Sequence, residues 1–458
     1  MSFNQLPKEL IRKNSGVKIE QPSRGFAGML ADTLEYYRCL AYYWTGGSFR
    51  KCPYFAGRLQ AQCQVYSVAI TLGYLWAKPH YRATSLQHDM CINFRNVAIP
   101  GTGVPLNLVV WCRAGAILFM LVLYPIVVLA AALKQALRRK VGLKNKIDLD
   151  VASSLYCEQL VTPQDWFSYW RLNSFLAGMH ATETQAKGFK QEDKWTFLED
   201  GDAAGVPISP YLKVPAIVVK DRYEEGGMGL FFFKNATEGG KWIIQERIEN
   251  SKFVKSLLPP NAPLSTFRVM TASRGGLTPK DPRLGCEATA EGFKQVPKGH
   301  VSAISCVFRA GRRNANTDHD SILYDVDKET GEIKQGTRNM HWYQLGLWKI
   351  FTCPWTSNEV FADHPDGGKH GCPARIPVKG KVVPNIKEIL HTSCLSHYLL
   401  LPDVPLVGWD VAVTDSGVCM LEVNLSCNFF KGSFNQEEYF KFMADYFLYL
   451  DDFRLRAK

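Results

Sequence analysis

The feature that most limits what this chain can fold into is an apolar run over residues 114–133, AGAILFMLVLYPIVVLAAAL, which carries no charge. At about 1.5 Å of helical rise per residue, the 20 residues span roughly 30 Å, the thickness of the hydrocarbon core of a bilayer. A soluble helix of this length normally keeps a polar stripe, and this run has none. We therefore predict a transmembrane helix, in which Pro125 is better tolerated than it would be in water.

Charge is distributed unevenly along the chain. Residues 1–146 contain 19 Lys and Arg against 5 Asp and Glu, a net +14, whereas the remainder contains 35 against 38, a net −3. Six basic residues lie between Lys134 and Lys146, after the run, and only Arg95 and Arg113 lie at a similar distance before it. The positive-inside rule then places the domain after the run on the cytoplasmic side, where ATP is. The basic segment shows no zinc-finger spacing and no aromatic-interleaved basic stripe, so it favours anionic lipid over nucleic acid.

The regions on either side of the run carry less specific signals. Residues 1–113 are basic and rich in aromatic side chains, which predicts contact with a membrane or with a protein partner. Within them, residues 59–77 are uncharged but contain three glutamines, so a second membrane span, an interfacial helix and a buried helix are equal alternatives. Residues 134–190 look helical and amphipathic, and we expect them to link the membrane helix to the next domain.

From about residue 191 the pattern of residue types changes. Short β-rich runs alternate with glycine-containing turns and a few helices, which predicts an α+β domain. At its start, Asp193 and Lys194 open a helical stretch that ends at Gly205. Without further context, Lys194 is best interpreted as a surface lysine.

A strand lysine and a glycine loop come next. Residues 216–219 form a short β-branched run that delivers Lys220 at its end, and a second run at 230–233 returns after a loop. Glycines let backbone N–H groups approach an anion closely, and a strand lysine can meet a phosphate as a point charge. A plain hairpin with a flexible loop is the competing interpretation. The chain lacks GxxxxGKS/T, which excludes a P-loop. The glycines of the loop are Gly226, Gly227 and Gly229.

A third segment, residues 242–244, is predicted to be a strand that leads into a short charged hinge. A hinge of this kind can offer backbone groups to an adenine and a carboxylate to a ribose. Taken alone, it is only a strand end with solvated charges. The hinge residues are Glu246, Arg247, Ile248 and Glu249.

The most specific pattern is a predicted hairpin towards the C-terminus. Asp410 lies in one strand, a turn follows at 415–417, and the returning strand carries Glu422 and Asn424. Residues two apart on a strand point to the same face, and a tight hairpin brings Asp410 opposite that face. Two carboxylates and an amide oxygen suit a magnesium ion held between protein and polyphosphate. The flanking residues are apolar, so charges among them need a partner or a metal.

Together, the four segments resemble the ATP-grasp superfamily. Its pattern is a lysine before a helix ending in GVP, a strand lysine, a small glycine loop, an adenine hinge and an Asp…Glu-x-Asn metal hairpin. The order and approximate spacing match over residues 192–430, about half of the chain. LSTFRVMTASRGG, and FADHPDGGKHGCPARIPV followed by VGWDVAVT, resemble the sugar-transfer-associated group of this superfamily.

The resemblance implies a fold in which two α+β lobes, residues 191–250 and 251–458, clasp ATP after a helical N-terminal region with at least one transmembrane helix. It also implies roles for residues. Lys194 and Lys220 would contact the α- and β-phosphates, and the three loop glycines would cover them. Glu246 to Glu249 would line the adenine and ribose.

The resemblance assigns the remaining roles to the second lobe. Arg268 would face the γ-phosphate or the developing acyl phosphate, and Arg309 is a further phosphate contact. Mg²⁺ would be bound by Asp410, Glu422 and Asn424. His364 and Asp366 match the HPD segment of the group but receive no mechanistic role. The loop NANTDHDSILYDVDKETGEI departs from the group, because it keeps Asp318 but lacks the usual glycine pair, which leaves substrate specificity open.

The function implied is a membrane-tethered enzyme that uses ATP and Mg²⁺ to ligate a carboxylate to an amine through an acyl phosphate. In such chemistry the protein mainly positions the reactants and spreads charge. Two alternatives are direct phosphorylation of a sugar or lipid head group, and a non-catalytic role as a subunit of a membrane assembly. The acceptor, a small molecule or an envelope-type compound, is not identified by the sequence.

Overall fold

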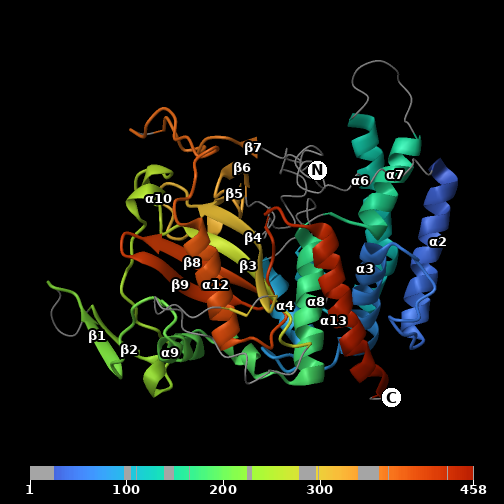
Figure 1. The fold of residues 1–458 in the computed structure, drawn as a ribbon, viewed down its shortest axis with the longest axis horizontal. Coiled ribbons are helices and arrows are strands. Elements are labelled where there is room, and N and C mark those ends of the chain that lie inside the picture. The colour runs from blue at the N-terminus through green and yellow to red at the C-terminus, as the bar shows by residue number, and fades with distance from the viewer. Residues whose placement is uncertain are drawn as a thin grey trace.

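The structure is a computed structural model, and it combines α-helices with a large antiparallel sheet (Figure 1). The sheet and its helices form one side of the molecule, and a helical bundle forms the other. The described residues are 25–96, 105–109, 111–138, 149–164, 166–223, 229–277, 296–297, 299–338, 360–369, 371–430 and 432–456.

The main sheet has seven strands in the order β7-β6-β5-β4-β3-β8-β9, and every neighbouring pair is antiparallel. All residues of β3 are buried, because this central strand is covered on both faces. Helices α9 and α12 pack against the sheet (Figure 1). The strands are β3 (Thr266–Ser273), β4 (Val301–Ala310), β5 (Ile322–Val326), β6 (Ile333–Arg338), β7 (Val360–Phe361), β8 (Leu406–Thr414) and β9 (Gly417–Asn424).

The helices divide between the bundle and the sheet. Those of the bundle are α2 (Gly25–Trp44), α3 (Leu59–Ile70), α4 (Leu86–Asn93), α5 (Arg113–Leu118), α6 (Tyr124–Arg138), α7 (Leu149–Val161), α8 (Trp166–Thr184) and α13 (Gln436–Arg456). Those beside the sheet are α9 (Lys194–Ala204), α10 (Lys252–Ser256) and α12 (Ile386–Leu400). Short 3₁₀ segments are η2 (Phe94–Asn96), η3 (Leu106–Leu108), η5 (Lys187–Glu192), η6 (Ala236–Glu238) and η7 (Asp318–Asp320), and π segments are η1 (Thr71–Leu75) and η4 (Phe119–Leu123).

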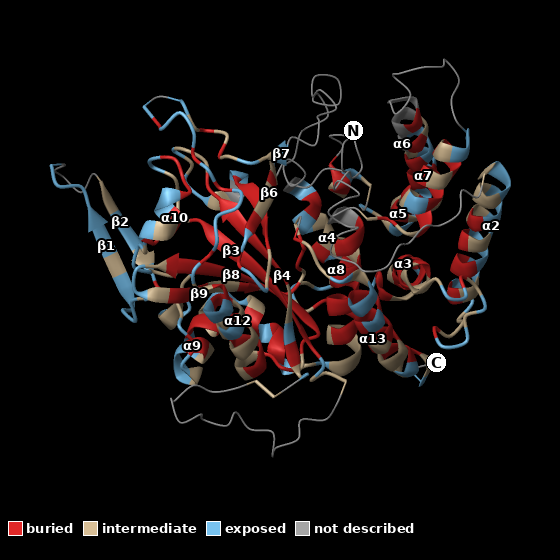
Figure 2. Cartoon of the chain, turned by 45° about the horizontal axis from the view of Figure 1, so that its top comes forward, coloured by how far each residue is buried: buried red, intermediate tan, exposed pale blue. Residues whose placement is uncertain are grey.

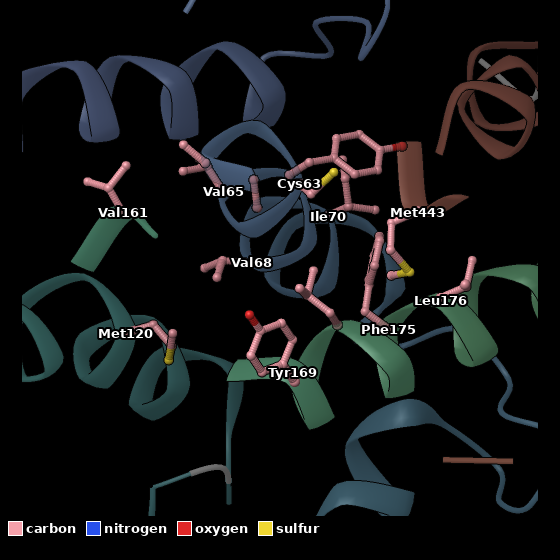
Figure 3. Packing of buried hydrophobic residues seen from close by; sticks show 14 of the residues in the cluster. Cys63, Val65, Val68, Ile70, Met120, Val161, Tyr169, Phe175, Leu176 and Met443 are labelled. Carbon is pink, nitrogen blue, oxygen red and sulfur yellow. The ribbon is translucent and has the colours of Figure 1, made fainter. Parts of the chain in front are cut away.

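The bundle shares one hydrophobic core that reaches from the N-terminal helices to the last helix of the chain. Ile70 of α3, Phe175 of α8 and Met443 of α13 lie together in it (Figure 3). Helices α7 and α8, expected to link two parts of the molecule, are themselves core elements. Residues 59–77 form α3, η1 and a short turn, and nine of the twelve residues of α3 are buried, as in the buried-helix alternative.

The apolar run forms a continuous helix from Arg113 to Arg138 through α5, η4 and α6. Arg113–Ala130 is long and apolar enough to cross a membrane, and 28% of this window is buried within the described structure. Pro125 has no N–H to give to the carbonyl of Leu121, four residues earlier. The hydroxyl of Tyr37 on α2 donates to that oxygen at 2.6 Å, so the neighbouring helix satisfies the acceptor.

Two strands, β1 (Ala216–Lys220) and β2 (Leu230–Lys234), form a separate antiparallel hairpin that extends from the body (Figures 1 and 2). Both strands were predicted. Most of their residues are exposed, including the large side chains of Phe231 and Phe232. The strand predicted at residues 242–244 is wrong, because Trp242 makes only a single bridge, to Asn235, and no ladder continues beyond it.

Candidate functional site

The first lysine of the site is positioned by a helix whose ends are both specified locally. Asp193 caps α9, because its carboxylate accepts a hydrogen bond from the N–H of Thr196 at 2.8 Å. Gly205 ends the helix in a left-handed conformation with φ of 72°, which favours glycine. Lys194 at the start of α9 extends to the sheet, where its Nζ lies 2.7 Å from Oε2 of Glu422.

The predicted hairpin is formed by β8 and β9. Its register places Asp410 directly opposite Glu422, and Gly408 opposite Asn424. Leu421 is an extra residue on β9, because the register shifts between Asp410 and the next residue. The three predicted metal ligands therefore share one face of the sheet. The amide nitrogen of Asn424 donates to the carbonyl of Gly408 at 3.5 Å.

Asp410 is the centre of a buried charge network. Its Oδ1 lies 2.7 Å from Nε of Arg268 and accepts from Nη1 of Arg309 at 3.2 Å, and its Oδ2 accepts from Nη2 of Arg268 at 3.0 Å. Burial alone would raise the pKa of Asp410, but the two guanidinium groups outweigh it and lower the pKa. Asp410 is therefore ionised, and both of its oxygens are held by cations.

The network continues into the loop that contains Asp318. Arg309 donates through Nη2 to Oδ1 of Asp318 at 3.0 Å, and Thr266 donates to Oδ2 of Asp318 at 2.5 Å. Burial raises the pKa of Asp318 in spite of this pairing with Arg309. Asp318 therefore links this loop to the site.

Phe430 covers the two arginines. Its ring centroid lies 5.1 Å from the guanidinium carbon of Arg268 and 5.5 Å from that of Arg309. Phe430 has a φ of 51°, a strained conformation for a bulky residue. Two cations under one ring are stabilised by its π face. No sequence signal identified Phe430, because nothing in NLSCNFF distinguishes it from a core aromatic.

A cavity of about 920 Å³ opens beside this network. It brings together residues from several predicted segments: the lysine that begins α9, the hinge, β4, β8 and β9. The predicted site residues that line it are Lys194, Glu246, Arg247, Ile248, Glu249, Arg309, Asp410 and Glu422. Thr266 and Asp318 line it as well.

Other predicted residues lie elsewhere. Lys220 and Gly229 belong to the exposed hairpin and do not line the cavity. Arg268 is buried behind Asp410, and Asn424 is not among the lining residues. Gly226 and Gly227 lie outside the described residues.

The donor set can be tested against magnesium. Among the described residues, no three His, Cys, Asp or Glu side chains are placed to hold a metal ion. Magnesium in nucleotide sites, however, usually takes one or two carboxylates together with phosphate oxygens and water. Asp410 and Glu422 are such a pair, adjacent across two strands at the wall of the cavity. The residues therefore fit Mg²⁺ bound together with a polyphosphate, and do not fit an all-protein cage.

The electrostatics of Lys194 agree with this interpretation. Burial alone would lower the pKa of Lys194, but its bond to Glu422 outweighs this and raises the pKa. Lys194 is thus a fully charged ammonium at the edge of the cavity, where it neutralises the more exposed of the two carboxylates. A polyphosphate entering the cavity would meet this ammonium and the guanidinium of Arg309.

A second cavity of about 540 Å³ shares Ala315 with the first. Arg312 grips Asp366 through two bonds, of 2.8 Å from Nε and 2.6 Å from Nη2, and the N–H of Arg313 donates to the same carboxylate at 3.1 Å. Lys369 also lines the cavity. The HPD segment therefore builds the wall of a polar cavity next to the main one.

His364 supports this wall as a neutral imidazole. Its Nδ1 accepts from the N–H of Asp366 at 3.2 Å, and its Nε2 donates to the carbonyl of Gly311 at 3.1 Å. Burial lowers the pKa of His364 to about 4. A proton on Nδ1 would oppose the N–H of Asp366, so both the burial and the bonding disfavour the charged form.

We expect a pH-dependent contribution of His364 to stability. The unfolded chain takes up a proton near pH 6.5 and the folded chain only near pH 4, so stability is present above pH 6.5 and is lost as the pH falls. In chemical denaturation, the difference in unfolding free energy between the wild type and His364→Asn should shrink by up to about 3 kcal/mol between pH 7 and pH 4. His391→Asn, at an exposed site on α12, is the control. A constant difference for His364→Asn would contradict the prediction.

No family model matches this chain, and no curated protein is significantly similar to it in sequence. The arrangement of the residues around the two cavities is therefore the basis for a functional assignment.

Proposed function

We propose that this protein is a membrane-attached enzyme of the ATP-grasp type, which uses ATP and Mg²⁺ to ligate a carboxylate to an amine through an acyl phosphate. The nucleotide would occupy the larger cavity, on the cytoplasmic side of the membrane. The helix Arg113–Arg138 would provide the membrane attachment.

One observation carries the proposal. Segments separated by up to about half of the chain, each singled out in the sequence for a different part of a nucleotide, line one cavity of about 920 Å³. Lys194 comes from α9, Glu246 to Glu249 from the hinge, and Asp410 and Glu422 from the β8–β9 hairpin. A random set of surface charges would not converge in this way, and the cavity volume suits a nucleotide with a small acceptor.

We assign each of these residues a role in binding the nucleotide or the metal ion. The hinge residues would hold the adenine and ribose, while Lys194 and Arg309 would bind phosphate oxygens. Asp410 and Glu422 would hold the Mg²⁺, which supplies charge neutralisation to the phosphates when bound. Arg268 would act through Asp410, because it lies behind this carboxylate and not in the cavity. In this arrangement each cation would lie where negative charge grows during phosphoryl transfer.

The acceptor would enter from the second cavity. Its wall carries the basic side chains of Arg313 and Lys369; Arg312 is paired closely with Asp366, and Lys369 lies 3.8 Å from the same carboxylate. The shared residue Ala315 makes this cavity a direct neighbour of the nucleotide cavity. An acceptor carboxylate held there would lie beside the phosphates without displacing the nucleotide.

Replacement of Glu422 tests the proposal. We expect Glu422→Gln to reduce acceptor-dependent ADP release by the full-length chain by roughly 100-fold or more, because the carboxylate that neutralises Lys194 and would bind Mg²⁺ loses its charge. Stabilisation by Mg²⁺–ATP in a thermal shift should fall in parallel. The control is Glu437→Gln, which removes an exposed carboxylate paired with Lys441 on α13.

The products decide between reaction classes. Amide formation with ADP release supports ligation, whereas a phosphorylated acceptor without any need for an amine would overturn it in favour of a kinase. If the wild-type chain showed no stabilisation by Mg²⁺–ATP, the nucleotide assignment itself would be wrong.

A further inference from the structure

We propose that the outer faces of α2 and of the helix α5–η4–α6 form one lipid-contacting surface that inserts into a bilayer with anionic head groups. This inference rests on the membrane attachment proposed above and extends it to a second helix. It is independent of the nucleotide chemistry. We call this surface the two-helix face.

Helix α2 exposes its apolar side and buries its acidic side chains, the opposite of a soluble helix. Its acidic side chains point into the protein, where Asp32 is gripped by Arg58 at 2.7 Å and Glu35 accepts from the N–H of Phe55 at 2.6 Å. Its outward side chains are apolar, with Phe26 exposed by 56% and Leu30 by 53%. The exposed large apolar residues of α2 are Phe26, Leu30, Leu34, Tyr37 and Trp44.

These residues are three, four or seven positions apart, so they lie on one side of the helix. Alanines at positions 27, 31 and 41 are exposed between them, and the single charge among the exposed residues is Arg38. Arg38 lies six residues before the end of the helix. From this position its long side chain can reach the polar head groups. A soluble helix would expose its polar side and bury this one.

The helix α5–η4–α6 likewise exposes an apolar side. One side of α5–η4–α6 packs into the core through residues such as Phe119 and Val128. The opposite side is exposed and carries no charge over residues 114–130, with Ile126 exposed by 58%. The exposed large residues are Leu118, Val122, Leu123, Ile126 and Leu129.

The two apolar sides adjoin. Tyr37, at the exposed side of α2, donates its hydroxyl to the carbonyl of Leu121 in η4 at 2.6 Å, which links the two helices, and α7 packs against both α2 and α6. At one end, Trp44 donates to the carbonyl of Ala69 at 2.9 Å, and Arg113 donates to that of Leu72 at 2.7 Å. The last residue of α2 and the first of α5 thus meet at the same turn of α3 and η1, so the helices run antiparallel. In Figure 2, α2, α5 and α6 lie on the same side of the molecule.

The dimensions and ends of this surface indicate lipid. From Phe26 to Trp44 the helix covers roughly 27 Å, close to the thickness of the hydrocarbon core. One end carries Trp44, Arg113 and Trp111, which is 66% exposed, and such residues favour the head-group region. The sequence beyond the other end of the apolar run carries six basic residues between 134 and 146, and residues 1–146 have a net charge of +14. Anionic lipid complements this charge.

A protein partner is the poorer fit. Protein interfaces combine an apolar centre with polar residues that form hydrogen bonds. Among the described side chains, the two-helix face offers one charged residue, Arg38, on α2, and none over residues 114–130 of the second helix. Apolar patches of this extent are rare on proteins that are surrounded by water.

The test uses the full-length chain, purified in detergent, with vesicles of phosphatidylcholine alone or mixed with phosphatidylserine. Leu30→Glu combined with Leu34→Glu should lower partitioning into the mixed vesicles by about 100-fold or more, because two charges would enter the hydrocarbon. The control, Leu212→Glu with Val382→Glu, changes two exposed apolar residues outside the two-helix face and should not alter partitioning. The wild type should bind the mixed vesicles at least about tenfold better than the neutral ones.

A photo-crosslinker at position 34 identifies the occupant. We expect adducts of lipid mass, and adducts to a second copy of the chain or to another protein would overturn the proposal, as would unchanged partitioning of the α2 variant. Mg²⁺–ATP thermal shifts of the same variants should match the wild type. Because this readout is separate, loss of nucleotide binding would count against the proposed enzyme, while loss of lipid adducts would count against the two-helix face.

Discussion

Asp410→Asn is expected to reduce the free energy of unfolding by about 3–5 kcal/mol and to abolish acceptor-dependent ADP release. The substitution keeps the size of the side chain but removes the negative charge between two buried guanidinium groups. Arg268 would then lose its counter-ion beneath Phe430, while Arg309 would keep only Asp318, and a buried unpaired charge is strongly unfavourable. Urea denaturation followed by circular dichroism measures the first effect, and a coupled ADP assay measures the second.

The matched control for this variant is Asp445→Asn. Asp445 also pairs with an arginine, Arg274, at 2.8 Å, but both side chains are almost half exposed, so the loss should be between 0 and about 1 kcal/mol. If Asp410→Asn and Asp445→Asn destabilised the protein equally, the buried network would not hold the site together. Full activity of Asp410→Asn would remove Asp410 from the proposed metal site.

Asp451→Asn should have an effect of similar size, in a part of the molecule remote from the cavities. Asp451 is buried on α13, where it accepts from the N–H of Phe49 at 2.7 Å, from the hydroxyl of Tyr66 at 2.8 Å and from Nε of Arg454 at 2.8 Å. Neutralising it leaves Arg454 buried without its counter-ion, and we expect a loss of about 3–5 kcal/mol. The same denaturation experiment measures it.

The neighbouring position provides the control, because Asp452 is exposed on the same helix and Asp452→Asn should change stability by less than about 0.5 kcal/mol. A small effect at Asp451 would mean that α13 does not join the N-terminal segments into one core. Two of the hydrogen bonds of Asp451, from Phe49 and Tyr66, join α13 to the N-terminal third across 402 and 385 positions of sequence.

The sequence alone was sufficient to predict an element of structure where a local rule applied. The start and end of α9 follow from Asp193 and Gly205, and both were predicted. The β8–β9 hairpin follows from strand alternation around a short turn, and the structure has it, but the Asp410–Glu422 pairing also needs the bulge at Leu421, which was not predicted. The run at 114–133 is apolar on all faces and forms a helix. In each case the information lies within a few residues, so no distant contact is needed to predict it.

The sequence-based prediction was wrong or incomplete where contacts between distant segments determine the structure. Residues 242–244 are β-prone, but they form no strand, because one isolated bridge at Trp242 is their only pairing. The strand lysine Lys220 matched a pattern, yet its hairpin stands apart from the cavity. The residue count between two segments does not determine how the loop between them orients the hairpin.

The sequence by itself determined the candidate charges of the site and the existence of a helix long enough to cross a bilayer. Only the tertiary structure decided which charges pair. It placed two arginines from β3 and β4 on Asp410, Lys194 on Glu422, and the ring of Phe430 above the guanidinium groups. It also decided which side of α2 faces outwards, because burial of Asp32 and Glu35 against Arg58 and Phe55 leaves the apolar side exposed. The physical reason is the same in each case. A side chain carries its chemistry in the sequence, but its charge state and its exposure depend on the groups that the fold brings against it.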